Sequence, residues 1–218
     1  MTEAEWLACT DPERMLEALR GKASDRKLRL FAAACCRSIW HLLVEQPCRT
    51  AVEVAEKFAD GDATQKDMQE AAHPLVWIRR ATNRSAAALY STWGTWSGTA
   101  SFCKDFHDAV RNTADYAARA KGLGKGRRRQ QAVLLRCIFG NPFRPSPPLP
   151  AAVLAWNDCT VRRIAAGIYE ERTFDRLPIL ADALLDAGCD GEDILAHCRG
   201  AGPHVRGCWA IDLILGKS

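Results

Sequence analysis

The sequence predicts an all-α protein, built as a multi-helix bundle of short αα-hairpins with a smaller C-terminal helical subdomain. Apolar residues recur three or four positions apart through most of the chain, as they do on one face of a helix. Gly, Pro and capping residues divide the chain into segments of helical length, and we expect about eight to ten helices. No stretch of four or more residues alternates cleanly between apolar and polar side chains, as a half-buried strand would.

Helix start and stop signals divide the first part of the chain. A capping residue followed by Pro predicts a helix start, and Gly is the usual residue just after a helix end. These signals are, in chain order, Thr10 or Asp11 with Pro12, Gly21, Ser24, Pro47, the Thr64–Asp67 capping box and Pro74, where the chain is expected to restart. Helical spacing resumes at Phe102 after a Gly-containing break at 91–101. We therefore expect an N-terminal helical bundle over residues 1–139.

A proline-rich stretch marks the predicted boundary. Residues 140–150 hold five of the ten Pro residues, so this connector is expected to be extended or irregular. The C-terminal helical subdomain is expected to cover residues 151–218. Its predicted helix starts are Asp158 or Thr160, Leu177, Asp190 and Pro203.

Composition narrows the classes of function. The formal charge of +4 permits an acidic partner without requiring one. Ten Cys are many for this length, but several fall on apolar helical stripes, and the N-terminus has no basic segment followed by an apolar one. We therefore expect free, mostly buried thiols in a reducing cytoplasm. No apolar run reaches the ~18–20 residues that span a bilayer, so no membrane partner is expected.

The densest chemistry lies in the segment 196–209, AHCRGAGPHVRGCW. A metal hypothesis takes as ligands Cys189, His197, Cys198, His204 and Cys208. His197 and Cys198 are adjacent, so on a helix they point about 100° apart, whereas His204 and Cys208 would share one helical face. The spacing does not match the paired ligands of usual structural zinc sites.

Two other interpretations of this segment stay open. In an anion hypothesis, a helix start at Pro203 binds a phosphate or carboxylate together with Arg199, His204 and Arg206. In a structural hypothesis, the Gly and Pro residues only form a turn between packed helices. The capping signals favour the structural hypothesis.

A basic segment indicates a nucleic-acid alternative. Its cations could contact phosphates, and Trp93 and Trp96 could stack on bases. These cations are Lys121, Lys125, Arg127, Arg128 and Arg129. Short basic runs are more often solvated, and this one reads as a flexible linker.

The sequence lacks the common catalytic motifs, so it gives little support to an enzymatic function. The chain has no G-x-S-x-G, Walker A or H-E-x-x-H pattern, and no G-x-G-x-x-G after a strand. Cys208 with His204 forms the candidate thiol dyad, but buried cysteines are commonly inert. Enzymatic activity is therefore the less expected outcome, and no cofactor is expected.

Three stretches carry a family resemblance: RGKASDRKLRLFAAACCRSIW, IFGNPFRP and FDRLPILADALLDAGCDGEDILAHCRGAGPHVRGCWAIDLILGK. In these stretches the chain resembles a large group of paralogous bacterial proteins that is abundant in planctomycetes. The resemblance implies a bacterial, intracellular protein and brings no catalytic residue or cofactor with it. An expanded family of this kind fits an interaction or regulatory role.

The sequence thus predicts a non-catalytic module that binds another macromolecule, in the first place a protein, through a helical surface that includes Arg199, His204 and Arg206. Nucleic-acid binding through 121–129 is the alternative. Metal- or thiol-dependent activity around His204 and Cys208 is the third hypothesis, and the oligomeric state is left open.

Overall fold

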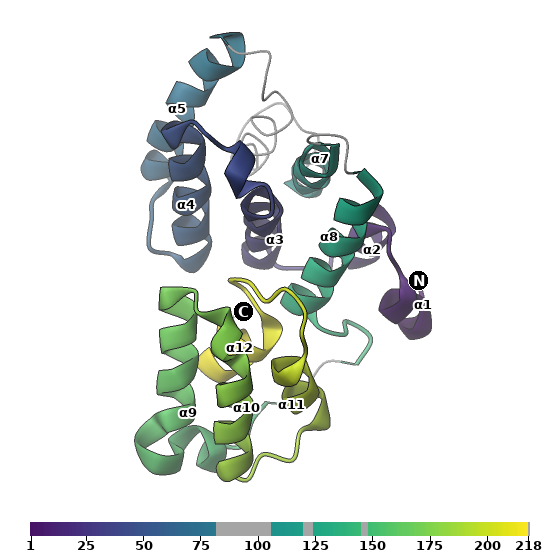
Figure 1. The fold of residues 1–218 in the computed structure, drawn as a ribbon, viewed down its shortest axis with the longest axis vertical. Helices are drawn as coiled ribbons and strands as arrows, with labels where there is room; N and C mark the ends of the chain where they lie inside the picture. Colours follow the sequence, from purple (N-terminus) through teal and green to yellow (C-terminus); the bar gives the residue numbers. More distant parts are fainter. Residues whose placement is uncertain (82–105, 120–123, 145–147, 218) are drawn as a thin grey trace. The chain divides into compact units, whose positions relative to one another are not determined.

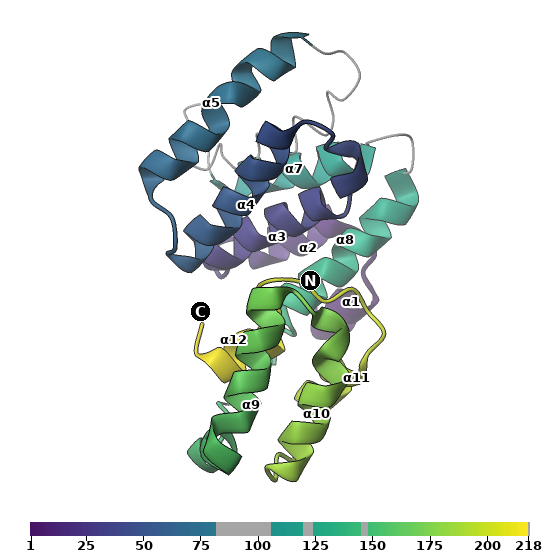
Figure 2. The same cartoon turned by 60° about the vertical axis from the view of Figure 1, so that its left-hand side comes forward.

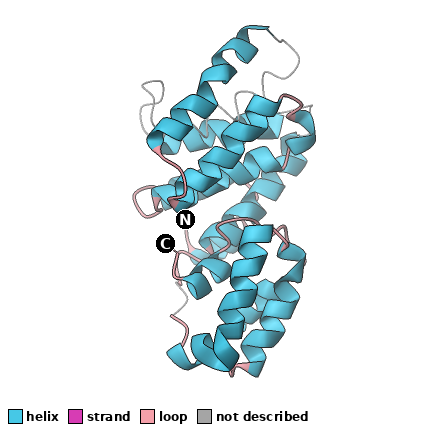
Figure 3. Cartoon of the chain, turned by 90° about the vertical axis from the view of Figure 1, so that its left-hand side faces the viewer, coloured by secondary structure: helices cyan, strands magenta, loops and turns pink. Residues whose placement is uncertain are grey.

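A computed structural model describes residues 1–81, 106–119, 124–144 and 148–217 (Figure 1). These residues form eleven α-helices and two short 3-10 helices, and no strand occurs among them (Figure 3). The predicted all-α fold class is confirmed. One short helix that no start signal predicted, α1 (Glu3–Ala8), adds to the expected number. None of the described helices is both long and apolar enough to cross a membrane.

The chain divides into two compact units. The first comprises Met1 and Ala8–Ala132, and the second comprises Thr2–Leu7 and Val133–Ser218. The division falls within α8 (Gly124–Phe139), earlier than the predicted connector at 140–150. The last turn of α8 belongs to the second unit because Cys137 is buried in that unit's apolar core. Residues 140–144 and 148–150 likewise belong to the second unit.

The first unit is a bundle built around α3. Its helices are α2 (Pro12–Leu19), α3 (Asp25–Arg37), η1 (Trp40–Leu42), α4 (Gln46–Asp60), α5 (Gln65–Ala81), α7 (Phe106–Arg119) and α8 as far as Ala132. Helix α3 packs against both α4 and α7 (Figure 2). It buries Leu28, Phe31 and Cys35, which recur at the helical spacing that the sequence shows.

The predicted caps of the first unit are confirmed. Asp11 accepts a hydrogen bond from the Glu13 backbone N–H and caps α2, with Pro12 as the first helical residue. Ser24 caps α3 in the same way through Lys27. The capping box before α5 is reciprocal, since the Thr64 N–H donates to Asp67 and the Asp67 N–H donates to Thr64.

Two expectations for the first unit are wrong. Helix α5 does not restart at Pro74 but continues through it, because buried Met68 and Leu75 hold both sides of the proline in the core. The expected basic linker is helical from Gly124, since Arg and Gln are good helix formers and Arg127 is buried. The expected break at 91–101 lies outside the described residues.

The second unit is a helical bundle with its own apolar core. Its elements are α1, the end of α8, α9 (Ala151–Glu171), η4 (Phe174–Arg176), α10 (Leu177–Asp186), α11 (Glu192–Arg199) and α12 (Trp209–Leu215). Helix α10 packs against α9 and α11, and α12 packs against α9 (Figure 1). Helix α9 starts earlier than expected, but its backbone leaves the helical region at Trp156–Cys159, and its second part begins at the predicted Thr160.

Candidate metal centre

Four metal-ligating side chains of the second unit lie together: Cys137, His197, His204 and Cys208. Their ligand atoms all lie within 4.8 Å of one another, and both cysteines are buried. Cys137 comes from the last turn of α8 and His197 from the last turn of α11. His204 and Cys208 come from the loop between α11 and α12. The cluster therefore joins three separate segments of the unit.

The distances within the cluster approach those of a tetrahedral site. The Cys137 Sγ lies 3.8 Å from the His204 Nδ1, and the His197 Nε2 lies 3.2 Å from the Cys208 Sγ. A zinc ion with tetrahedral ligands would separate a sulfur from a nitrogen by about 3.5 Å. The two imidazole rings stand nearly perpendicular, at 84°, with centroids 4.8 Å apart. They therefore approach the cluster from different directions.

Backbone geometry places the two loop ligands. Helix α11 ends at Arg199, and Gly200 turns the chain into an extended conformation. Gly207, with a φ of +85°, redirects the chain just before Cys208, a conformation that favours glycine. Cys208 then occupies the position before the first residue of α12. His204 and Cys208 thus meet through a loop and not through a shared helical face.

A second hydrogen bond orients the His204 ring. Its Nε2 lies 3.0 Å from the Gly200 carbonyl oxygen, to which an Nε2–H donates. The Nδ1 is the ring nitrogen that faces the Cys137 Sγ. Metal-binding histidines commonly donate their other ring N–H to a carbonyl or carboxylate. The His204 environment has this arrangement.

The local electrostatics favour a thiolate at Cys208. Burial by itself raises the pKa of this thiol, but hydrogen bonds with Cys137, His197 and His204 bring its pKa well below the ordinary value. For His204, burial opposes the charged form, and the contacts with Cys208 and Gly200 raise its pKa overall. By contrast, burial raises the pKa of the neighbouring Cys198 to about 12. A cysteine binds a metal through its deprotonated sulfur, and the surroundings of Cys208 favour this deprotonated form.

The metal hypothesis named five residues, and the structure brings three of them together. Cys198 is buried in the apolar core instead of joining the cluster, because adjacent residues on a helix point about 100° apart. Cys189 precedes α11, whereas His197 lies in the last turn of that helix, so the two are separated by the length of α11. The fourth member, Cys137, was missed because it is 67 residues away from His204 and reads as one apolar position in the stripe LLRCIF.

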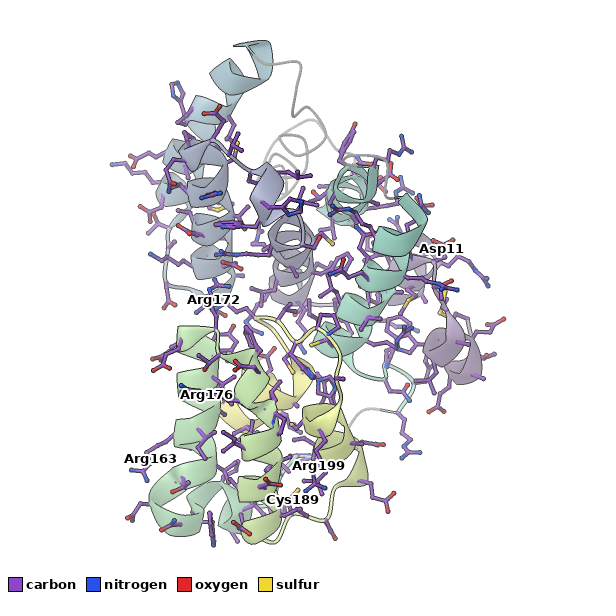
Figure 4. The ribbon with its side chains drawn as sticks, in the orientation of Figure 1. Asp11, Arg163, Arg172, Arg176, Cys189 and Arg199 are labelled. Atoms are coloured by element: carbon purple, nitrogen blue, oxygen red, sulfur yellow. The ribbon has the colours of Figure 1, made fainter. Side chains whose placement is uncertain are left out.

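The helix start on which the anion hypothesis depends is absent from the structure. Pro203 does not start a helix, because α12 begins only at Trp209. The Arg199 guanidinium, labelled in Figure 4, pairs with Asp182 at 3.1 Å. The Arg206 guanidinium stacks 4.6 Å from the centre of the Tyr169 ring. Both predicted cationic contact residues therefore make contacts within the unit.

The basic segment is partly used inside the first unit. Arg127 is buried and donates to the Ser38 carbonyl. Arg128 pairs with three carboxylates, while Arg129 is exposed. The three carboxylates are those of Asp11, Glu13 and Asp115. Lys121, Trp93, Trp96 and the Lys125 side chain lie outside the described residues.

Comparison of the chain with protein families, curated proteins and solved structures gives no match. The expected relation to paralogous bacterial proteins stays a prediction. The chemistry available to the cluster is that of its atoms, two sulfurs and two imidazole nitrogens. Such a set binds Zn²⁺ and similar borderline-soft cations.

Proposed function

We propose that this protein binds Zn²⁺ through Cys137, His197, His204 and Cys208, and that the ion has a structural role in the second unit. The observation that supports this most is the convergence of two sulfur and two nitrogen ligand atoms within 4.8 Å. Four protein ligands complete the tetrahedral coordination that zinc prefers in structural sites. This proposal takes up the metal hypothesis from the sequence with a structural ion in place of the metal- or thiol-dependent activity, and it replaces the expectation of no cofactor.

Burial favours a structural ion over a catalytic one. A catalytic zinc site keeps one position open for water or substrate, whereas this donor set fills all four positions. Cys208 has no exposed surface, and Cys137 is only 3% exposed. The same burial argues against a Cys–His nucleophile, because a substrate needs access to the reacting sulfur. The proposed role is therefore to join α8, α11 and the loop 200–208.

Zinc content of the purified full chain tests this proposal. We expect one zinc ion per chain by elemental analysis, and loss of the ion in Cys137→Ser, His204→Ala and Cys208→Ser. Cys189→Ser is the matched control, because it removes a buried thiol of the same unit that lies outside the cluster. Wild-type protein without zinc after growth in zinc-supplemented medium, or equal zinc content in all four variants, would overturn the proposal.

Binding of a partner protein remains a prediction from the sequence. A structural zinc ion contributes to folding and does not by itself require or exclude a partner. Arg199 is half-exposed, so it is the predicted contact residue that a partner could reach without unfolding the unit. A pull-down with Arg199→Ala, compared with wild type at equal zinc content, separates a contact role from a structural one.

A further inference from the structure

Helix α1 contacts the turn of α8 that carries the ligand Cys137. The Trp6 indole N–H donates to the Gly140 carbonyl oxygen at 3.0 Å. The Arg136 guanidinium donates in the opposite direction, to the Trp6 carbonyl oxygen at 3.2 Å. The Asn141 amide donates to the Glu3 carboxylate at 2.5 Å. These contacts involve the residue before Cys137 and two residues shortly after it.

The same turn is linked to a second ligand. Gly140 has a φ of +62°, and a Cβ added there would lie 3.2 Å from the Trp209 Cγ. The Trp209 indole therefore lies directly against the Gly140 backbone. The Trp209 ring also lies 5.1 Å from the His197 ring, measured between centroids. A path of contacts thus runs from Trp6 through Gly140 and Trp209 to His197.

A ligand in the last turn of a helix needs such support. The final turn of a helix lacks part of its backbone hydrogen bonding and frays easily. A metal requires its ligand atoms to be placed to within about 0.2 Å. Cys137 is in the final turn of α8, whose last residue is Phe139. Cys137 is buried in the core of the unit, and contacts that hold the turn from outside the helix would further fix the position of its Sγ.

We propose that α1 is a positioning element of the metal centre, in which Trp6 and Arg136 fix the α8 turn and thereby the Cys137 sulfur. This inference rests on the proposed zinc site. It gives the first residues of the chain a role in metal affinity, although none of them is a ligand. Because coupling between two sites is reciprocal, zinc binding must also strengthen the docking of α1.

Zinc affinity of full-length variants tests this role, measured by competition with a chromophoric chelator. We expect Trp6→Ala to weaken zinc binding about fivefold or more. Leu7→Ala is the matched control, because Leu7 lies on the same helix and is 56% exposed. Trp6→Phe, which keeps a buried ring, should recover part of the affinity. Arg136→Met removes the hydrogen bond to the Trp6 carbonyl without leaving a cavity in the core. If Trp6→Ala does not fold, the zinc affinity of Arg136→Met tests the role of α1 instead.

A spectroscopic reading separates positioning from general loss of stability. With Co²⁺ in place of zinc, we expect the sulfur-to-metal absorption of Trp6→Ala and Arg136→Met to fall toward that of Cys137→Ser. Variants with wild-type affinity and wild-type cobalt spectra would overturn the role of α1 while leaving the zinc site intact. Wild-type protein that binds neither metal would overturn the zinc site and this inference together.

Discussion

Gly140 shows how single atoms support the candidate centre. Its carbonyl accepts the Trp6 indole N–H, and its backbone lies against the Trp209 ring. Its φ of +62° lies in the left-handed region, which costs other residues about 1–2 kcal/mol. A side chain at this position would therefore add backbone strain and a tight contact, 3.2 Å from the Trp209 Cγ, from which the indole would have to move by a few tenths of an ångström.

Gly140→Ala should lower the free energy of unfolding by about 2–4 kcal/mol, from backbone strain and overpacking together. Gly216→Ala is the matched control, because Gly216 has a similar φ of +69° and no atom near its added Cβ. The control should cost about 1–2 kcal/mol. Urea unfolding of both variants measures the difference. Equal losses of unfolding free energy in the two variants would show that Trp209 moves aside at no cost. Gly140 would then be required only for its left-handed backbone conformation.

At this scale the sequence predicted the candidate site only in part. His197, His204 and Cys208 stand out because they are close in sequence and have metal-binding chemistry. The metal hypothesis grouped these three, but it placed His204 and Cys208 on one helical face, because Pro203 was expected to start a helix and instead lies in the loop. Cys137 carries no local signal, since a thiol on an apolar stripe reads as core. Its role depends on tertiary contacts that one sequence does not display.

Two helices of the first unit are joined by an ion pair whose carboxylate is almost out of solvent, while the Arg37 side chain is 25% exposed. Arg37 of α3 donates to the Glu56 carboxylate of α4 at 2.8 Å, and the Glu56 side chain is only 3% exposed. The Arg37 guanidinium also lies 4.0 Å from the centre of the Trp40 ring. Removing the cation would leave a carboxylate in surroundings where its charge is costly.

Arg37→Met should destabilise the first unit by about 3 kcal/mol, because a buried charge loses its cation. The double variant Arg37→Met with Glu56→Met should regain most of that loss, since neither charge is then buried. Lys66→Met is the control, because its pair with Glu70 is largely exposed and should contribute less than about 1 kcal/mol. Urea unfolding gives all three values. A double variant as unstable as Arg37→Met would contradict the explanation.

Helices were predictable where their signals are local. Asp11, Ser24 and Thr64 cap helices as expected, since a cap is decided by the next few residues. Pro74 did not break α5, because tertiary packing outweighs the local penalty of proline. Helix α1 was missed because it is short and depends on contacts with the distant α8 turn.

The whole molecule consists of two units, and the candidate metal centre belongs entirely to the second. All four ligands lie in residues 133–218, and the supporting α1 segment, Thr2–Leu7, is part of the same unit. If zinc holds these segments together, removal of the ion acts on this unit first. Bound zinc at a free concentration of about 1,000 times its Kd would contribute about 4 kcal/mol to stability.

Hydrogen exchange of the full chain, with zinc bound and after chelation, is the measurement that tests this account most directly. Loss of the ion should speed exchange in α11, the loop 200–208, the last turn of α8 and α1. Residues 8–81 should keep their protection, because no ligand of the cluster lies there. Equal exchange in the second unit with and without zinc would contradict a structural zinc site.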